Sequence, residues 1–467
     1  MTLWGGRFGE GPAEALWAFT VSPADRRLLL DDLEGSLAHI AGLVHAGILD
    51  EADGRALRTG LEQIQSEVFR GVFVFEEGDE DVHSAVERRL FEIGGEAAGR
   101  LHTGRSRNDQ IALDLRLHLR DAAASRIRQI AGLARALALR AEEAGETVVA
   151  SYTHLQQAQA VPFAHHLLAH AWALVRDAER FRDALNRIDV SPLGAGAGGG
   201  SRLPLDPSFV AARLGMSGVF ENSLDAVSSR DVEAEYLFCC VQTMVHLSRL
   251  AEELVLWSTA EFGWAEYADR HTTGSSALPH KKNPDAAELA RGKAATAIGH
   301  LTGLLALQKG LPLSYNRDLQ QDKEHLFPAD DDLAGALDVL TAMILEASFD
   351  PPSPGPWVAA LDLAEVLVER GVPFREAHRV VGGMVATLEE AGLDFASLTA
   401  EHLAAAHPLF RPDDVATADP VESVRARRSP GGASFESAAA QLGMLAGRLD
   451  ALERSAGALD RSGGAEA

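Results

Sequence analysis

The stretch SRNDQIALDLRLHLRDAAASRIRQIAGLARALALR, residues 106–140, decides the fold. It is rich in Ala, Leu and Arg, which are strong helix formers, and it contains no glycine or proline before Gly132. Ser106 followed by Asp109 resembles a capping box, the polar pair that starts many helices. Apolar residues alternate locally, as in a strand, but the run is far longer than a normal strand. The stretch therefore predicts a long helix buried in a bundle.

Further long helices are predicted before a strong helix breaker. They cover 160–189, 230–262 and 284–310, and Pro284 suits the start of the last one. The run DPPSPGP at 350–356 breaks helices and indicates a domain boundary. We expect an all-α protein with a long central bundle and three domains: an N-terminal helical domain (1–105), the bundle (106–355), and a smaller helical domain with a loose tail (356–467).

Composition restricts the classes of function. A net charge of −25 disfavours nucleic-acid binding, which needs clustered Lys and Arg. The sequence has neither a signal peptide pattern nor a long apolar run, so we expect no secretion and no membrane span. The only cysteines, Cys239 and Cys240, are neighbours and suit a reducing compartment. We therefore expect a cytoplasmic protein.

The segment GAGAGG at 194–199 fits G-x-G-x-x-G through Gly194, Gly196 and Gly199. A dinucleotide site needs a strand before this motif and a helix after it. Pro192 precedes it here, and Ser201 to Pro204 follow. A flexible connection between helices is the better interpretation.

Three histidines, His165, His166 and His170, lie on one predicted helix. His166 and His170 are four residues apart, as a metal-binding pair can be. No adjacent Glu completes a zinc-protease pattern, and no cysteine is near. We therefore expect packing or surface histidines and no metal site.

The segment TTGSSALPHKKNPDAAE, residues 272–288, combines a Gly-Ser-Ser loop, two lysines and a helix start. Small residues suit a mobile loop, and lysines with exposed amides suit an anion. All lysines of the chain lie between Lys281 and Lys323, which favours sites that need a compact ammonium group. From composition alone, a solvated charged loop remains an equal alternative.

Several stretches together resemble one family. GSSALPHKKNP (274–284) is similar to the signature loop of the fumarase/aspartase superfamily. Other segments resemble its argininosuccinate lyase branch: LWGGRF (3–8), EDVHSAVERRL (80–90), LHTGRSRNDQ (101–110), YTHLQQAQ (152–159), NSLDAVSSRD (222–231), YNRDLQQDK (315–323) and RRSPGGAS (427–434). They occur in family order along nearly the whole chain.

The resemblance implies a three-domain fold of this superfamily and a reversible β-elimination. Argininosuccinate would be split into L-arginine and fumarate, the last step of arginine biosynthesis. It also implies no cofactor and a homotetramer in which each active site combines segments of three subunits.

By the same resemblance, the catalytic residues are Ser275, His154, Lys281 and Glu288. Lys281 would activate the Ser275 hydroxyl and stabilise developing negative charge. His154 suits proton transfer near neutral pH, and Glu288 would pair with it. Which of Ser275 and His154 is the base and which the acid stays open.

The implied substrate contacts come from four of these segments and, for Ser22, from the N-terminal region. Arg105 and Arg107 are further candidates for steering an anion, and His83 is a second-line contact. The contacts carried over are Ser22, Asn108, Thr153, Asn283, Tyr315, Gln320 and Lys323.

Two other classes of function compete with this interpretation. The nearest is another fumarate-releasing lyase, such as an adenylosuccinate lyase, which would share the signature loop but lack TGRSRNDQ and YNRDLQQDK. The second is a non-catalytic structural homologue. Retention of the polar residues His154, Ser275, Lys281 and Lys323 disfavours it, since unpaired polar burial is costly.

Overall fold

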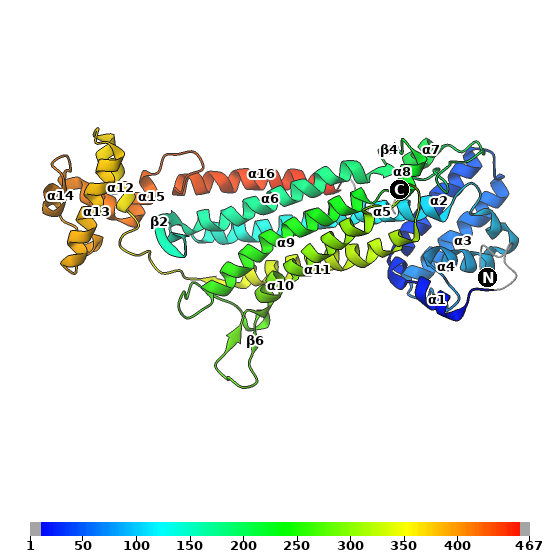
Figure 1. The fold of residues 1–467 in the computed structure, drawn as a ribbon, viewed down its shortest axis with the longest axis horizontal. Coiled ribbons are helices and arrows are strands. Elements are labelled where there is room, and N and C mark those ends of the chain that lie inside the picture. The colour runs from blue at the N-terminus through cyan, green and yellow to red at the C-terminus, as the bar shows by residue number, and fades with distance from the viewer. Residues whose placement is uncertain (1–10, 458–467) are drawn as a thin grey trace.

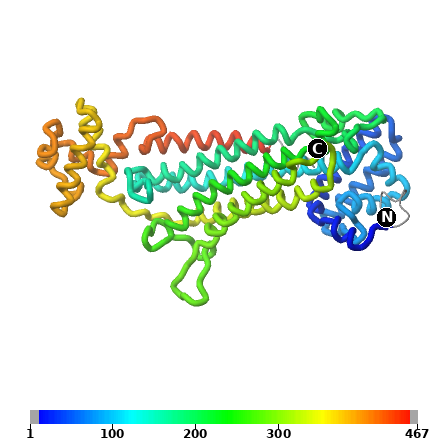
Figure 2. The backbone as a smooth tube through the Cα atoms, in the orientation of Figure 1, coloured from blue at the N-terminus to red at the C-terminus, as the bar shows by residue number. Residues whose placement is uncertain are grey.

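The structure, a computed structural model, describes residues 11–457. The motif LWGGRF (3–8) and the tail expected at the C-terminus lie outside these residues. Long helices form a central bundle, and a group of shorter helices lies at each end of it (Figures 1 and 2). The described residues are mainly helical with short strands, so the all-α prediction is confirmed.

Long helices that run side by side form the bundle. The stretch 106–140 is helical as predicted, and the capping box is present: the Asp109 carboxylate accepts the backbone N–H of Ser106 at 2.9 Å. Pro284 is the N-cap of α10. The bundle consists of α5 (Arg107–Glu143), α6 (Phe163–Ile188), α9 (Asp231–Trp257), α10 (Asp285–Gln308), α11 (Asp322–Glu346) and α16 (Phe435–Gly457).

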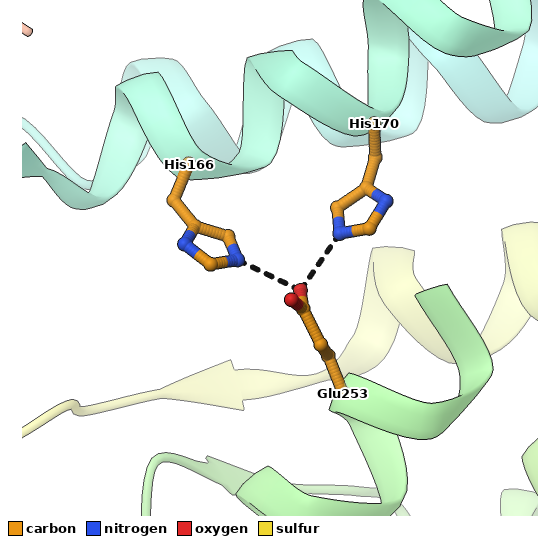
Figure 3. A group of neighbouring side chains, drawn as sticks. All are labelled: His166, His170 and Glu253. Atoms are coloured by element: carbon orange, nitrogen blue, oxygen red, sulfur yellow. Dashed lines mark hydrogen bonds and ion pairs between the residues drawn. The ribbon is translucent and has the colours of Figure 1, made fainter. Parts of the chain in front are cut away.

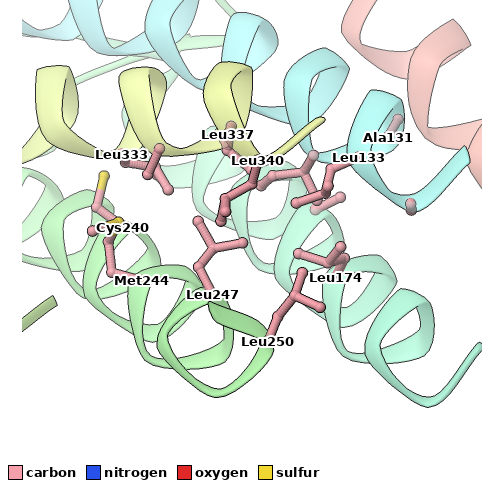
Figure 4. Close-up of a cluster of buried hydrophobic side chains, with 14 of the residues drawn as sticks. Ala131, Leu133, Leu174, Cys240, Met244, Leu247, Leu250, Leu333, Leu337 and Leu340 are labelled. Atoms are coloured by element: carbon pink, nitrogen blue, oxygen red, sulfur yellow. The ribbon is translucent and has the colours of Figure 1, made fainter. Parts of the chain in front are cut away.

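The core of the bundle is built from leucines that face one another across the helices (Figure 4). Leu174 of α6, Leu247 and Leu250 of α9, and Leu337 and Leu340 of α11 are almost fully buried. Each such side chain contributes about 1.5–3 kcal/mol relative to an exposed one. This continuous core fixes the positions of the long helices and of the polar segments attached to them.

The N-terminal helices have a core of their own, with Leu33, Leu61 and Leu90 at its centre. A second apolar cluster, containing Ala38 and Leu113, attaches them to α5. The elements are α1 (Glu14–Thr20), η2 (Pro23–Leu28), α2 (Leu29–His45), α3 (Glu51–Phe69), α4 (Val82–Gly94) and η3 (Gly95–Arg100), where η marks a 3-10 helix. Two short helices, α7 (Pro207–Arg213) and α8 (Ser223–Ser228), lie between α6 and α9 in sequence.

The C-terminal helices also have a separate core, which includes Leu363, Val381 and Leu403. Their elements are α12 (Ala360–Glu369), α13 (Phe374–Glu390), η6 (Phe395–Ser397), α14 (Ala400–Ala406), η7 (Pro412–Ala418) and α15 (Pro420–Ala426).

The last helix, α16, differs from the segment expected at 356–467. It returns to the bundle, where Leu445 and Leu449 join the bundle core (Figure 1). Its apolar residues recur at helical spacing and need a partner surface, which the bundle provides. The boundaries proposed at 105 and 355 stay a prediction, and residues 435–457 pack with the middle segment.

The described residues also contain four short strand pairs. The hairpin of β1 (Val148–Thr153) and β2 (Gln156–Pro162) was not predicted, and the helix expected from residue 160 begins at Phe163. The others are β3 (Val190–Ser191) with β4 (Gly218–Val219), β5 (Ala265–Glu266) with β8 (Ser348–Phe349), and β6 (Thr273–Gly274) with β7 (Lys282–Asn283); two further 3-10 turns are η4 (Asp269–His271) and η5 (Arg317–Gln321). Within residues 11–457, no helix is both long and apolar enough to span a membrane.

Candidate active site

A polar cavity of about 270 Å³ lies where the N-terminal helices meet the bundle. Its walls come from the start of η2, the residues before α4, the first turn of α5 and the segment that leads into α11. Five of the seven predicted substrate contacts line it: Ser22, Asn108, Tyr315, Gln320 and Lys323. Residues separated by up to 300 positions in sequence therefore share one cavity.

Lys323 is held in this cavity by a buried ion network. Its Nζ lies 2.7 Å from the Asp322 carboxylate, whose other oxygen accepts the Nε–H of Arg230 at 2.6 Å. Burial alone raises the pKa of Asp322, but the charges of Lys323 and Arg230 outweigh it and keep the pKa below its ordinary value. The carboxylate stays ionised and fixes the ammonium group at the cavity wall.

His83 forms the deepest basic part of the cavity. Its Nε2 lies 2.8 Å from the Asp114 carboxylate, and its Nδ1 lies 3.6 Å from that of Asp81. Burial lowers the pKa of His83, but the hydrogen bonds to Asp114 and Asp81 raise it well above the usual value. The raised pKa favours the charged form of the ring, and His83 stays a second-line candidate for contact with an anionic substrate.

Two arginines at the cavity mouth are oriented by acidic residues. Arg107 Nη1 lies 2.9 Å from Asp81 and 3.2 Å from Glu80, and Arg317 Nη1 lies 3.2 Å from Glu80. Arg107 thus lines the cavity as a steering residue should. Arg105 does not line this cavity: its side chain is buried and donates to Ser36 Oγ at 3.0 Å. Its steering role stays a prediction.

The glycine-rich segment 194–199 binds a carboxylate of the protein itself. Asp109 accepts the backbone N–H groups of Gly194 at 3.0 Å and Gly196 at 2.8 Å. Both glycines have positive φ, and a Cβ on Gly194 would meet Pro207 at 2.7 Å. The segment connects helices, as expected, and Ala197 O of this loop accepts the Asn108 side-chain amide at 3.4 Å.

The signature loop projects from the bundle between β6 and β7 (Figure 1). Ser275 is partly exposed, and its Oγ accepts the backbone N–H groups of Ala277 and Leu278 at 3.3 and 3.1 Å. Lys281 is exposed, and no carboxylate within residues 11–457 forms an ion pair with it. Asn283 lies on β7, and Glu288 is exposed in the first turn of α10.

His154 occupies the tip of the β1–β2 hairpin, at the opposite end of the bundle from the cavity (Figure 1). His154 and Leu155 have positive φ, and Thr153 beside them is exposed. No hydrogen bond joins His154 to Glu288 in the described chain. One chain therefore places the predicted polar residues at three separate locations: the cavity, the signature loop and the hairpin tip.

Sequence comparisons identify the family. A profile described as Lyase matches residues 6–299, and one described as Argininosuccinate lyase C-terminal matches residues 357–425. The argininosuccinate lyase of Symbiobacterium thermophilum is 46% identical over 450 residues, 95% of this chain and 98% of that protein. The argininosuccinate lyase of Frankia casuarinae is 47% identical over 456 residues, 96% of this chain and 98% of that protein. The chain belongs to the argininosuccinate lyase family.

Solved structures agree with this membership of the argininosuccinate lyase family. EDDS lyase in complex with formate has a TM-score of 0.80 at 27% identity, covering 95% of this chain and 91% of that chain. The class II fumarase of Schistosoma mansoni has a TM-score of 0.70 at 15% identity, covering 88% and 92%, and shows the shared fold alone. The predicted family, superfamily fold and lyase class are confirmed, and the substrate is a small molecule.

Sequence reasoning missed several residues that shape the cavity of this argininosuccinate lyase family member. Asp322 and Arg230 are both buried, and Glu80 and Arg317 lie at the mouth. Each of them lies within a motif quoted for the family resemblance. The sequence did offer one signal for these residues. A charged residue at the start of a helix that enters the core needs a partner of opposite sign if it is buried.

Proposed function

We propose that this protein splits argininosuccinate into L-arginine and fumarate by reversible β-elimination. The observation that carries the proposal is the cavity lined by Ser22, Asn108, Tyr315, Gln320 and Lys323 in a chain that matches argininosuccinate lyases over nearly its full length. Argininosuccinate carries several carboxylates and a guanidino group. Fixed cations and amide donors around a polar cavity are the groups that such a molecule needs.

In this proposal the cavity binds and orients the substrate. Lys323, Arg107 and the imidazolium of His83 offer positive charge to its carboxylates. Burial raises the pKa of Tyr315, so its phenol stays protonated and donates a hydrogen bond. Tyr315, Gln320 and Lys323 would hold the arginine end, and Asn108 with Thr153 the succinate part.

The chemical step removes a proton from the carbon next to a carboxylate and then breaks the C–N bond. Ser275 takes the proton, and the carboxylate becomes a short-lived dianion. Lys281, Asn283 and the amides of residues 274–276 stabilise that dianion, and the proximity of Lys281 activates Ser275. Lys281 has no carboxylate partner in the described chain, so its charge is free for this role.

Collapse of the dianion expels the guanidino nitrogen of arginine and leaves fumarate. His154 donates a proton to that nitrogen, and Glu288 orients the imidazole. The roles of Ser275 and His154 interchange in the reverse reaction, when arginine adds to fumarate. No part of this scheme requires a cofactor.

The three locations meet only if different subunits contribute them, so we propose a homotetramer with active sites shared between subunits. Helix α10 supports this arrangement because it exposes Leu289, Ile298 and Leu305, an apolar surface that suits contact with another copy. Each site would then combine a cavity, a signature loop and a hairpin tip from neighbouring chains.

A cytoplasmic location fits the cysteines. Cys239 and Cys240 are free and buried, and burial raises the pKa of Cys239 to about 12, so it stays an unreactive thiol. Uncharged thiols packed in a core suit a reducing compartment. In that compartment the enzyme would complete arginine biosynthesis.

The test follows the absorbance of fumarate after addition of argininosuccinate, with adenylosuccinate assayed in parallel. The wild type should release fumarate from argininosuccinate only. Ser275→Ala should lose nearly all activity, whereas Ser276→Ala, an exposed neighbour in the same loop, should keep most of it. No fumarate from argininosuccinate would contradict the function, and an active Ser275→Ala protein would contradict the assigned base.

A further inference from the structure

Two histidines of α6 and one glutamate of α9 converge on a single point (Figure 3). His166 Nε2 and His170 Nε2 each lie 2.7 Å from the same oxygen of Glu253. The sequence contained the histidine pair but no adjacent acidic residue, and the third group lies 83 positions beyond His170. A metal site was disfavoured because the sequence showed no carboxylate near the histidines. The fold supplies that carboxylate.

The three donor atoms match the ligands of a transition metal. All three lie within 4.8 Å of one another. Two imidazoles and one carboxylate form a ligand set used for Zn²⁺, with a fourth position left for water. Metal–ligand bonds of about 2.0–2.2 Å in a tetrahedron put the donor atoms roughly 3.3 Å apart, so the Glu253 carboxylate must retreat by about half an ångström. Its side chain is 34% exposed and has room to do so.

Metal binding requires a change in the protons of this cluster. In the metal-free state, the Nε2–H groups of His166 and His170 donate to Glu253. A metal needs the Nε2 lone pairs, so the protons move to Nδ1. The imidazole side chains are 21% and 15% exposed, which lets water solvate Nδ1.

The surroundings favour a soft divalent ion over a hard one. Mg²⁺ and Ca²⁺ prefer six or more oxygen ligands, whereas this cluster offers two nitrogens and one carboxylate. The Trp257 ring stands edge-on to His166 at 5.4 Å and limits water on one side. The other group of this kind within residues 11–457, Asp32 with His83 and Asp114, is buried, and of its members only His83 lines the cavity.

We propose that His166, His170 and Glu253 bind one divalent transition-metal ion of the Zn²⁺ class per chain. The ion links α6 to α9 at the end of the bundle that carries the β1–β2 hairpin. This site is separate from the proposed elimination chemistry, which needs no metal. Its presence and the function proposed above can therefore fail independently.

The experiment uses the full-length protein, freed of metal with a chelator and then titrated with Zn²⁺ by calorimetry. Parallel titration with Co²⁺ reports geometry, because a tetrahedral site gives much stronger visible absorption than an octahedral one. We expect one ion per chain, and an affinity that falls as the pH drops, because protons compete with the ion for its ligand atoms. Bound Zn²⁺ should also raise the thermal midpoint.

The decisive variants are His170→Gln and Glu253→Gln. Glutamine at 170 can still donate a hydrogen bond to Glu253, so the variant separates a helix contact from a metal ligand. We expect both variants to weaken Zn²⁺ binding by more than about 100-fold, since even outer-shell partners cost about 10–100-fold.

The matched control is His165→Gln, because His165 lies on the same helix and contacts Gln441 instead. It should bind Zn²⁺ like the wild type. Unchanged Zn²⁺ affinity in His170→Gln and Glu253→Gln, or no stoichiometric binding to the wild type, would overturn the proposal and leave the cluster as a hydrogen-bonded contact. A cooperative thermal unfolding transition in each variant reports that it is folded.

Discussion

The cavity and the signature loop differ in how their charged groups are held. In the cavity, Lys323 is paired with a buried carboxylate, and Arg107 is paired with two others. In the loop, Lys281 is exposed and unpaired within the described chain, and Ser275 contacts only the loop itself. One region is organised before substrate arrives, and the other is left open.

In the proposed mechanism, this difference separates substrate binding from the chemical step. Preformed donors lower the entropic cost of holding a flexible substrate, because fewer groups must be ordered on binding. An exposed loop that carries Ser275 and Lys281 can close over the substrate and exclude water at the reacting carbon. We infer that changes in the loop alter turnover, whereas changes behind the cavity alter stability.

The largest effect is expected for Lys281→Ala. It should lower kcat by about 10²–10³-fold, because it removes a fixed positive charge from the developing dianion. The matched control is Lys282→Ala, since Lys282 already pairs with Asp269 at 2.9 Å. Steady-state fumarate release measures both. Equal losses in the two variants would show that the loop responds to total charge and not to one placed ammonium group.

Mixing two inactive variants tests whether subunits share sites. Lys281→Ala and Asn108→Ala alter different regions, and each should be inactive alone. After joint dissociation and reassembly, random mixing should restore about a quarter of the sites, because these take the loop from an Asn108→Ala chain and the cavity from a Lys281→Ala chain. Fumarate release before and after mixing is the measurement. No recovery, while a wild-type sample treated identically does recover, would place both segments in one subunit.

Asp322→Asn tests the rigidity of the cavity. The variant leaves Lys323 and Arg230 without their shared buried carboxylate, so the free energy of unfolding should fall by about 3–5 kcal/mol. The control is Asp331→Asn, whose exposed pair with Arg27 should cost less than about 1 kcal/mol. Shifts of the urea midpoint at constant m-value measure both. Similar shifts would contradict the contrast between buried and exposed ion pairs.

The smallest effect concerns pH and the ion pair between Glu67 of α3 and Arg89 of α4. Hydrogen bonds from Arg89 lower the pKa of Glu67 from 4.5 to about 2. A lowered carboxyl pKa stabilises the fold above pH 4.5, and this contribution disappears as pH falls toward 2.

Glu67→Gln should therefore lower stability by about 1 kcal/mol at pH 6, with the difference shrinking below pH 4.5. Unfolding midpoints across this pH range give the measurement. Glu62→Gln, at an exposed position of the same helix, is the control and should show no such pH dependence. A difference that persists unchanged at pH 2.5 would contradict the assignment.

Local patterns predicted the helices well because local physics forms them. The capping box of Ser106 and Asp109 and the Ala- and Leu-rich run after it indicated α5 correctly. The β1–β2 hairpin escaped prediction because its turn depends on positive φ at His154 and Leu155, which neither residue type signals. The packing of α16 on the bundle was not predicted, because DPPSPGP indicated a domain boundary and all later residues were assigned to a separate domain.

The sequence predicted which residues belong to the candidate site, but it did not predict their positions relative to one another. Motifs named Asn108, Tyr315 and Lys323, and the structure brings these together. The pairing of Lys323 with Asp322 and Arg230, and of His166 with Glu253, depends on helices that are distant in sequence. Such contacts arise only when tertiary packing fixes the helix faces, so no local pattern encodes them.

The position of α16 has a consequence during protein synthesis. The nascent chain leaves the ribosome from its N-terminus, so α5, α6, α9, α10 and α11 emerge before this last helix. Until then, the groove that receives Leu445, Leu449 and Leu452 is open to water. A truncated or stalled chain ending before residue 435 would expose that apolar surface to chaperones and to other incomplete copies.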